Sequence, residues 1–144
     1  MRYKEQNPDK VTAYLEKIAS IPKDKLVYVD ETGIDFYLYR EYCYAQRGKK
    51  VAGYVSGKKY HRLGIVAAKI SGNTLAPLQY DGTMDSLLFE TWFSECLLPI
   101  LPIGSTIVMD NAAFHRKSRL APMAVNAGHC LMFLPSYSPE LNPI

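Results

Sequence analysis

The chain has 144 residues, of which 48% are hydrophobic and 22% are charged, and its formal net charge is +3. This composition excludes an intrinsically disordered protein, and the length suits one compact domain. The N-terminus is polar, unlike a signal peptide, and no apolar run approaches the roughly 20 residues of a membrane-spanning helix. We therefore predict a soluble globular domain in the cytoplasm, with no membrane partner.

Three cysteines, Cys43, Cys96 and Cys130, are widely spaced along the chain and form no CxxC pair. Their odd number and their spacing argue against a disulfide framework and against a zinc site. They fit a protein of the reducing cytoplasm. We expect all three to be small buried side chains.

The first half of the chain predicts one helix and a series of strands. Apolar residues recur at helical spacing over residues 8–19, after Asn7 and Pro8, which are typical of a helix start. Short runs rich in β-branched and aromatic residues predict strands, the first of which ends on Asp30. The Ser-Gly-Asn triplet that begins at Ser71 predicts a hairpin turn. The predicted strands are residues 26–30, 34–39, 61–70 and 75–79.

The second half of the chain predicts helices that alternate with strands. Residues 84–98 have the clearest helical pattern, with an apolar side formed by Leu87, Leu88, Trp92 and Cys96. An antiparallel meander followed by helix, strand, helix and strand predicts a mixed α/β sheet covered by helices. The remaining predicted elements are a strand at 105–110, a helix at 118–127 and a strand at 129–134, followed by a loop at 135–142.

The excess positive charge is concentrated in residues 40–62, where seven Lys or Arg side chains stand against the single acid Glu41. Tyrosines are interleaved with them, and such a segment can follow a sugar-phosphate backbone through charge and stacking. The alternative is a solvated hairpin whose tyrosines pack on the sheet beneath. The residues predicted to bind DNA are Arg47, Lys49, Lys50, Lys58, Lys59 and Arg62.

Two acids, Asp30 and Asp110, each end a hydrophobic strand and begin a polar turn. If these strands are neighbours in the sheet, the two carboxylates emerge at the same edge and repel each other unless a cation lies between them. Their hard oxygen ligands suit Mg²⁺ or Mn²⁺, and a pair of such ions can support phosphodiester chemistry. The alternative is structural, because a strand-end acid can also cap a turn or pair with a basic side chain.

Three segments, VYVDETG at 27–33, VMDNAAFH at 108–115 and LPSYSPELNPI at 134–144, resemble motifs of the mariner superfamily of DDE transposases in their order and spacing. The similarity is strongest to the bacterial insertion-sequence (six-thirty group) branch, and the last of the three motifs is the most specific. The resemblance implies a ribonuclease H-like fold, with a mixed five-stranded sheet flanked by helices. It makes Asp30 and Asp110 the first and second catalytic, metal-binding acids.

The resemblance also implies an activity and its partners. The family cuts DNA at transposon ends with two Mg²⁺ or Mn²⁺ ions, and the freed 3′-hydroxyl then attacks target DNA. DNA is thus the expected partner, and a homodimer is left open. Glu31 either supports the first acid or faces solvent. Asn111 and His115 either orient a phosphate or the attacking water, or hold the turn and cap the next helix.

In that family a third acid follows the Asn-Pro-Ile of the last motif, and this sequence ends at Ile144. We read Glu140 as a loop or helix-entry acid and not as its substitute. We therefore expect residues 1–144 to be a catalytic domain that is incomplete at its C-terminus, lacks an N-terminal helix-turn-helix domain and is inactive alone. The alternative function is a catalytically inactive remnant that only binds DNA or a protein partner.

Overall fold

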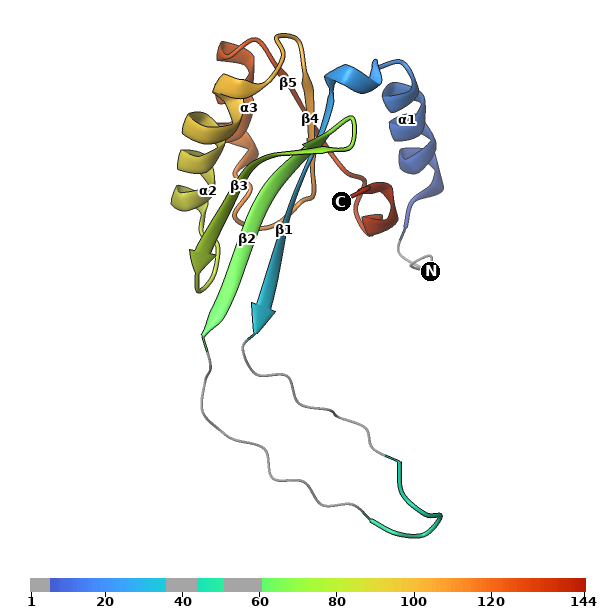
Figure 1. Cartoon of the computed structure of the whole chain (residues 1–144). Coiled ribbons are helices and arrows are strands. Elements are labelled where there is room, and N and C mark those ends of the chain that lie inside the picture. The colour runs from blue at the N-terminus through green and yellow to red at the C-terminus, as the bar shows by residue number, and fades with distance from the viewer. Residues whose placement is uncertain (1–5, 36–43, 51–60) are drawn as a thin grey trace.

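The computed structural model describes residues 6–35, 44–50 and 61–144, and within them one five-stranded sheet in the order β3-β2-β1-β4-β5 (Figure 1). β1, β2 and β3 are antiparallel neighbours, whereas β4 and β5 run parallel to β1. The strands are β1 (Leu26–Asp35), β2 (Arg62–Ile70), β3 (Asn73–Asp81), β4 (Thr106–Met109) and β5 (Cys130–Phe133), and the α-helices are α1 (Pro8–Ala19), α2 (Ser86–Trp92) and α3 (Lys117–Asn126).

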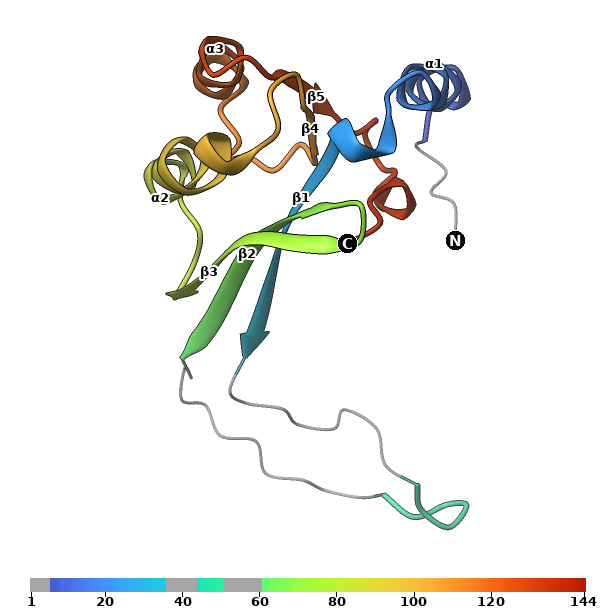
Figure 2. The same ribbon diagram turned by 45° about the horizontal axis from the view of Figure 1, so that its top comes forward.

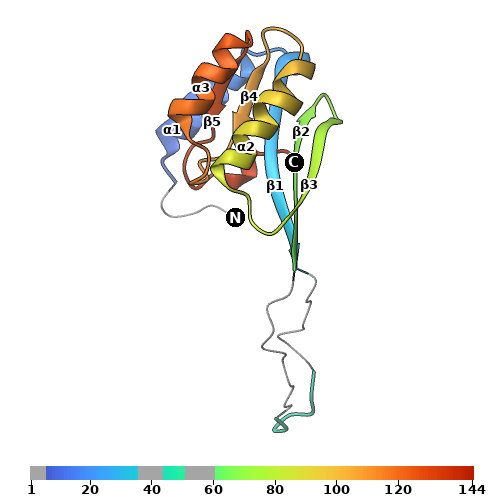
Figure 3. The same cartoon turned by 90° about the vertical axis from the view of Figure 1, so that its left-hand side faces the viewer.

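Helices cover both faces of the sheet. α2 and α3 lie together on one face, while α1 lies on the other (Figures 2 and 3). Alternate residues of each strand point to opposite faces, so Val27 and Ile107 join the core beneath α2 and α3, whereas Val108 packs with Tyr14 of α1. The mixed α/β sheet flanked by helices that the sequence predicts is confirmed. None of the helices that the structure describes has the length and apolar character needed to cross a membrane.

β1 differs from the prediction. A single strand runs through residues 26–35 in place of strands at 26–30 and 34–39, and residues 36–39 lie outside the described part of the chain. Asp30 is therefore in the middle of β1 and not at its end. Gly33, read as a turn residue, is paired with Gly64 of β2, and a Cβ at Gly33 would collide with the guanidinium of Arg62. A glycine inside a strand here marks the close approach of a neighbouring side chain.

The helix predicted at 84–98 also differs in its buried side. α2 is followed by a π-helical turn (Phe93–Leu97) and a 3-10 turn (Leu98–Ile100). Leu87 and Cys96 are exposed, so two of the four residues of the predicted apolar side are wrong, whereas Trp92 is buried and Leu88 packs against the core. The largest fully buried side chains of this stretch are Phe89, Trp92, Phe93 and Leu97, because aromatic volume fills the space against the sheet and the π-helical turn shifts the pattern by one residue.

Trp92 joins α2 to an irregularity in β3. Its indole Nε1 donates a 2.7 Å hydrogen bond to the carbonyl of Ala76, where the β2–β3 register shifts between Val66 and Ala68. Ala76 has a positive φ of 46°, and the next residue, Pro77, has no N–H to donate to the ladder. The indole therefore satisfies a carbonyl at a β-bulge, and only 1% of Trp92 is exposed.

The cysteine prediction is wrong for the two cysteines that the structure describes. Cys96 and Cys130 are both exposed, and Cys43 lies outside the described residues. Cys96 falls on the outer side of the π-helical turn, and Cys130 begins the edge strand β5. An edge strand with one solvent-facing side leaves such a residue uncovered.

Candidate active site

Asp30 and Asp110 are brought together by parallel pairing of β1 with β4. The register pairs Val27 with Ile107 and Tyr28 with Val108. Two steps further along the same register, Asp30 of β1 stands beside Asp110, the first residue after β4. Neighbouring strands are about 4.8 Å apart, so the two acids converge although 80 positions separate them in the sequence.

Both acids line one cavity of about 230 Å³, together with Glu31, Arg62 and Phe114. Asp110 also lines a second cavity of about 410 Å³, formed with Asn111 and the loop Leu134–Pro139. Asp110 therefore lies between two cavities. The smaller one is lined by residues of β1, and the larger one by residues of the third sequence motif. The polar loop at Ser136, Tyr137 and Ser138 borders the larger cavity.

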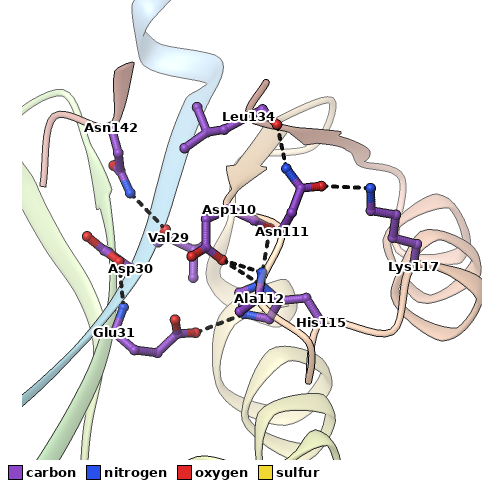
Figure 4. A network of polar contacts seen from close by, with 10 residues as sticks. All are labelled: Val29, Asp30, Glu31, Asp110, Asn111, Ala112, His115, Lys117, Leu134 and Asn142. Atoms are coloured by element: carbon purple, nitrogen blue, oxygen red, sulfur yellow. Dashed lines mark hydrogen bonds and ion pairs between the residues drawn. The ribbon is translucent and has the colours of Figure 1, made fainter. Parts of the chain in front are cut away.

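His115 links the two strands through a network of polar contacts (Figure 4). Its Nε2 lies 3.0 Å from Glu31 Oε1, and its Nδ1 lies 2.9 Å from Asp110 Oδ1. The ring is 5% exposed and packs against Phe89, with ring centroids 4.2 Å apart. The backbone N–H of Ala112 also donates to Asp110 Oδ1 at 3.0 Å. The carboxylate of Asp110 is thus held from two directions.

The charges of this network are coupled. Burial alone would lower the pKa of His115, but hydrogen bonds to Asp110 and Glu31 outweigh it and raise the pKa to about 9. The hydrogen bond from His115 lowers the pKa of Asp110. Burial raises the pKa of Asp30, and the nearby carboxylates of Glu31 and Asp110 add to the effect. At neutral pH, His115 is therefore an imidazolium that donates from both nitrogens to acids.

The donor set suits a hard divalent cation. Ligand atoms of Glu31, Asp110 and His115 all lie within 4.8 Å of one another. Because both nitrogens of His115 are engaged as donors, the carboxylate oxygens are the better ligands, and Asp30 adds another to the same cavity. Asp30 accepts a 2.9 Å hydrogen bond from the N–H of Glu31. The pKa of Asp30 is raised by burial first and by the nearby carboxylates of Glu31 and Asp110 second, and a cation bound here would favour the charged form of all three acids.

Asn111 links the turn after β4 to the segment that follows β5. Its Nδ2 donates a 2.6 Å hydrogen bond to the carbonyl of Leu134, just after β5. Lys117 Nζ donates to Asn111 Oδ1 at 2.7 Å. Of the two readings left open for Asn111, these contacts favour the one in which it holds the turn. His115 does not cap α3 with a side-chain hydrogen bond, and Glu31, with 12% of its side chain exposed, does not face solvent.

The third motif packs against β1. Asn142 Nδ2 donates to the carbonyl of Val29 at 3.3 Å, directly before Asp30. Glu140 lies in a 3-10 turn (Pro139–Leu141) and accepts a hydrogen bond from Gln6 at 2.5 Å. Its place in this turn agrees with the reading of Glu140 as a loop or helix-entry acid. All three sequence motifs thus meet where β4 and β5 end, beside the middle of β1.

The residues predicted to bind DNA fall in different places. Arg47, Lys49 and Lys50 are exposed in a turn that lies beyond the outer ends of β1 and β2 (Figure 1), and Tyr44 in the same stretch is fully exposed. Tyr44 therefore does not pack on the sheet. Lys58 and Lys59 lie outside the described residues. Arg62 is on β2, where it lines the cavity of Asp30 and lies 4.0 Å from Asp35.

The contacts of the basic residues at the N-terminal end of α3 were not predicted from the sequence. Arg116 donates to both carboxylate oxygens of Glu90 at 2.7 and 2.8 Å, and Arg119 lies 3.7 Å from the same carboxylate. Lys117 contacts Asn111 instead. A signal was available, because basic residues in the first turn oppose the helix dipole and α3 has no acid there.

Residues 25–144 match the sequence profile of the DDE superfamily endonucleases. The chain belongs to this family. No curated protein sequence matches it.

Among solved structures, the chain is similar to the Mos1 strand transfer complex, with a TM-score of 0.69 and 15% identity over 94% of this chain and 42% of that one. It is also similar to the Mos1 transposase paired-end complex with the left transposon end (TM-score 0.68, 14% identity, 99% and 47% covered). For the catalytic domain of Mos1 mariner transposase the values are 0.65, 13%, 99% and 69%. The chain spans less than half of the first two proteins, and the ribonuclease H-like fold is confirmed.

Proposed function

We propose that this chain is the catalytic core of a DNA transposase, which cuts DNA at transposon ends and transfers the freed strand to target DNA. The observation that carries the proposal is the convergence of Asp30 and Asp110 on neighbouring parallel strands, where both line one cavity. Membership of the DDE superfamily endonucleases supports the nuclease chemistry. The three motifs support the bacterial insertion-sequence branch of the mariner superfamily.

In this proposal Asp30 and Asp110 hold Mg²⁺ or Mn²⁺, two ions in the complete site, together with the third acid that the family places after the Asn-Pro-Ile motif. The bound ions supply activation of the attacking oxygen and stabilisation of the leaving oxygen of a phosphodiester. The solved structures similar to this chain include a Mos1 mariner paired-end complex with Mn (13% identity, TM-score 0.67), which supports the choice of metal.

The chain's own residues keep the ligands in position. His115 fixes the carboxylate of Asp110 through its Nδ1, and Glu31 fixes the ring of His115 through its Nε2. Asn111 ties the residue after Asp110 to the end of β5. Such outer contacts typically change metal affinity about 10- to 100-fold when they are removed. Glu31, Asn111 and His115 are therefore positioning residues in this proposal.

DNA is the proposed partner. The exposed turn with Arg47, Lys49 and Lys50 would contact the phosphate backbone, together with Lys58 and Lys59. Arg62 would act closer to the acids, since it lines their cavity. The Mos1 structures similar to this chain include a paired-end complex with a transposon end, which supports DNA as the ligand.

Direct metal binding tests the proposal without requiring turnover. Mn²⁺ is titrated into the purified chain and followed by electron paramagnetic resonance, for the wild type, Asp30→Asn and Asp110→Asn. We expect each variant to weaken Mn²⁺ binding by at least about tenfold, since each removes a charged ligand. Glu16→Gln on the exposed side of α1 serves as the matched control. Equal Mn²⁺ affinity in all four proteins would sink the proposal.

A further inference from the structure

Lys117 is a cation fixed beside the candidate active site. Its Nζ donates a 2.7 Å hydrogen bond to Asn111 Oδ1 and lies 4.3 Å from the ring centroid of Phe133 (Figure 4 shows the contact with Asn111). Both partners are neutral. The side chain is therefore held in place without loss of its charge.

Two basic residues near Lys117 in the sequence, Arg116 and Arg119, are paired with an acid, unlike Lys117. The carboxylate of Glu90 accepts two hydrogen bonds from Arg116 and lies 3.7 Å from Arg119. One buried acid thus pairs with both arginines, and the three groups together carry one net positive charge. Within the part of the chain that the structure describes, Lys117 forms no such ion pair with a carboxylate.

The position of Lys117 at the N-terminal end of α3 adds further positive charge that no acid of the helix's first turn offsets. It is the first residue of α3, and the first turn of α3 contains no acid. The N-terminal end of a helix carries partial positive charge, so a lysine there is unfavourable unless an anion lies close by. A phosphate group would be attracted both by the ammonium group and by the partial positive charge of this helix end, which no side chain of the described residues caps.

Asn111 connects this cation to the acids. It lines the cavity of about 410 Å³ that Asp110 also lines, and the rest of that cavity includes Ser136 and Ser138. An anion bound at Lys117 would lie at the border of this cavity. The ligand that fits an isolated, fixed ammonium group next to a nuclease site is a phosphate of the nucleic acid backbone.

We propose that Lys117 binds a backbone phosphate of the DNA strand that enters the site at Asp110. This inference rests on the proposed function, and it deepens it by adding a DNA contact that is separate from the basic segment at residues 40–62. The contact is independent of base sequence, since an ammonium group recognises the charge of a phosphate.

The test is DNA binding by Lys117→Gln, measured by fluorescence anisotropy with a labelled 20-base-pair DNA duplex at several KCl concentrations. We expect the affinity to fall at least fivefold at low salt, and the slope of log affinity against log salt to decrease by about 0.9, the value for one phosphate contact. Lys117→Arg keeps the charge and should stay within twofold of wild type. Arg119→Gln removes a charge of the same helix that is paired with Glu90, and its slope should change less than that of Lys117→Gln.

Two outcomes separate this inference from the proposed function. If the wild-type chain binds the duplex with a salt-dependent affinity and Lys117→Gln has the same affinity and slope, the assignment of Lys117 is overturned and the transposase proposal stands. If the wild-type chain does not bind the duplex at any salt concentration, both are overturned. Thermal unfolding of each variant shows whether its fold is retained, and a folded Lys117→Gln protein with lower affinity supports the inference.

Discussion

Glu31 Oε1 and His115 Nε2 are 3.0 Å apart, although 84 positions separate the two residues in the chain. The contact joins the middle of β1 to the loop that follows β4, and the other nitrogen of the same ring holds Asp110. One imidazole ring therefore sets the positions of two acids from different strands. The pKa of His115 can be measured directly.

We expect His115 to titrate at about pH 9, because Asp110 and Glu31 stabilise its charged form more than burial opposes it. A histidine with a raised pKa stabilises the fold below its unfolded pKa of about 6.5 and loses that contribution as the pH rises to about 9. The difference corresponds to roughly 3 kcal/mol. Nuclear magnetic resonance of the ring nitrogens in the metal-free protein measures the midpoint, and Glu31→Gln should lower it. A midpoint near 6.5 in the wild type would contradict this network.

The ion pair between Glu90 and Arg116 should make a different contribution to stability. The carboxylate of Glu90 is buried, and the hydrogen bonds from Arg116 lower its pKa. Arg116→Gln removes both hydrogen bonds to the buried carboxylate and leaves it with Arg119 alone, at 3.7 Å, whereas Glu90→Gln removes the charge itself, so we expect the arginine variant to be the less stable of the two. Urea unfolding at pH 7 compares them. Equal stability of the two variants would mean that Glu90 is not desolvated.

The same pair gives a pH dependence with the opposite sign to that of His115. An acid with a lowered pKa stabilises the fold above its unfolded pKa, which is about 4.3 for glutamate, and this contribution is lost as the pH falls through the folded value. The stability difference between wild type and Glu90→Gln should therefore shrink as the pH falls below 4.5. Unfolding curves at pH 7, 5 and 3.5 measure this difference. A constant difference over that range would count against the predicted linkage.

Asn111→Ala should destabilise the edge of the sheet at the active site. The substitution leaves the carbonyl of Leu134 without its 2.6 Å hydrogen bond and frees Lys117 from its acceptor. Loss of a partner for a partly buried carbonyl costs about 1–3 kcal/mol. Urea unfolding measures the loss, and Asn126→Ala near the end of α3 is the matched control on an exposed site. A change no larger than that of the control would show that the link between Asn111 and Leu134 is not formed.

Charge reversal of Lys49, Lys50, Lys58 and Lys59 to glutamate should weaken DNA binding and flatten its salt dependence. Each backbone contact that is lost reduces the slope of log affinity against log salt by about 0.9, because fewer counterions are released. Anisotropy of a labelled duplex at several salt concentrations measures affinity and slope together. Reversal of Lys10 and Lys17 on α1, compared with reversal of Lys49 and Lys50 alone, controls for the change in net charge. An unchanged slope in the quadruple variant would mean that the basic segment does not touch DNA.

Most of the strands could be predicted from the sequence because apolar runs such as that of β4 have few other solutions, whereas local patterns did not predict that β1 lies beside β4. The apolar runs before Asp30 and Asp110 left the structural alternative open, and it was the resemblance of the motifs that implied a shared site for the two acids. The length of β1 could not be predicted. Gly33 lies between the two strands predicted there, and its pairing with Gly64 of β2, with the Arg62 side chain lying over it, became visible only in the structure.

The contacts of His115 with Glu31 and Asp110 could not be predicted from the sequence either, because they also depend on residues far apart in the chain. Glu31 follows Asp30 on β1, so its side chain leaves the strand on the opposite face. Whether it meets solvent or His115 depends on the loop after β4, whose path no local pattern specifies. The role of Lys117 was missed for the same reason, because Asn111 and Phe133 come together only when β4 and β5 are paired.

The indole of Trp92 gives the molecule a built-in optical reporter. It is the single tryptophan of the chain, and it lies buried between α2 and the irregular part of β3. Its emission maximum should lie toward the blue while α2 stays on the sheet and should move toward the red once water reaches the ring. Separation of this helix from the β2–β3 hairpin can therefore be followed in the unlabelled protein, and because Phe89 of α2 contacts both Trp92 and His115, the same signal also reports on the helix that covers the candidate site.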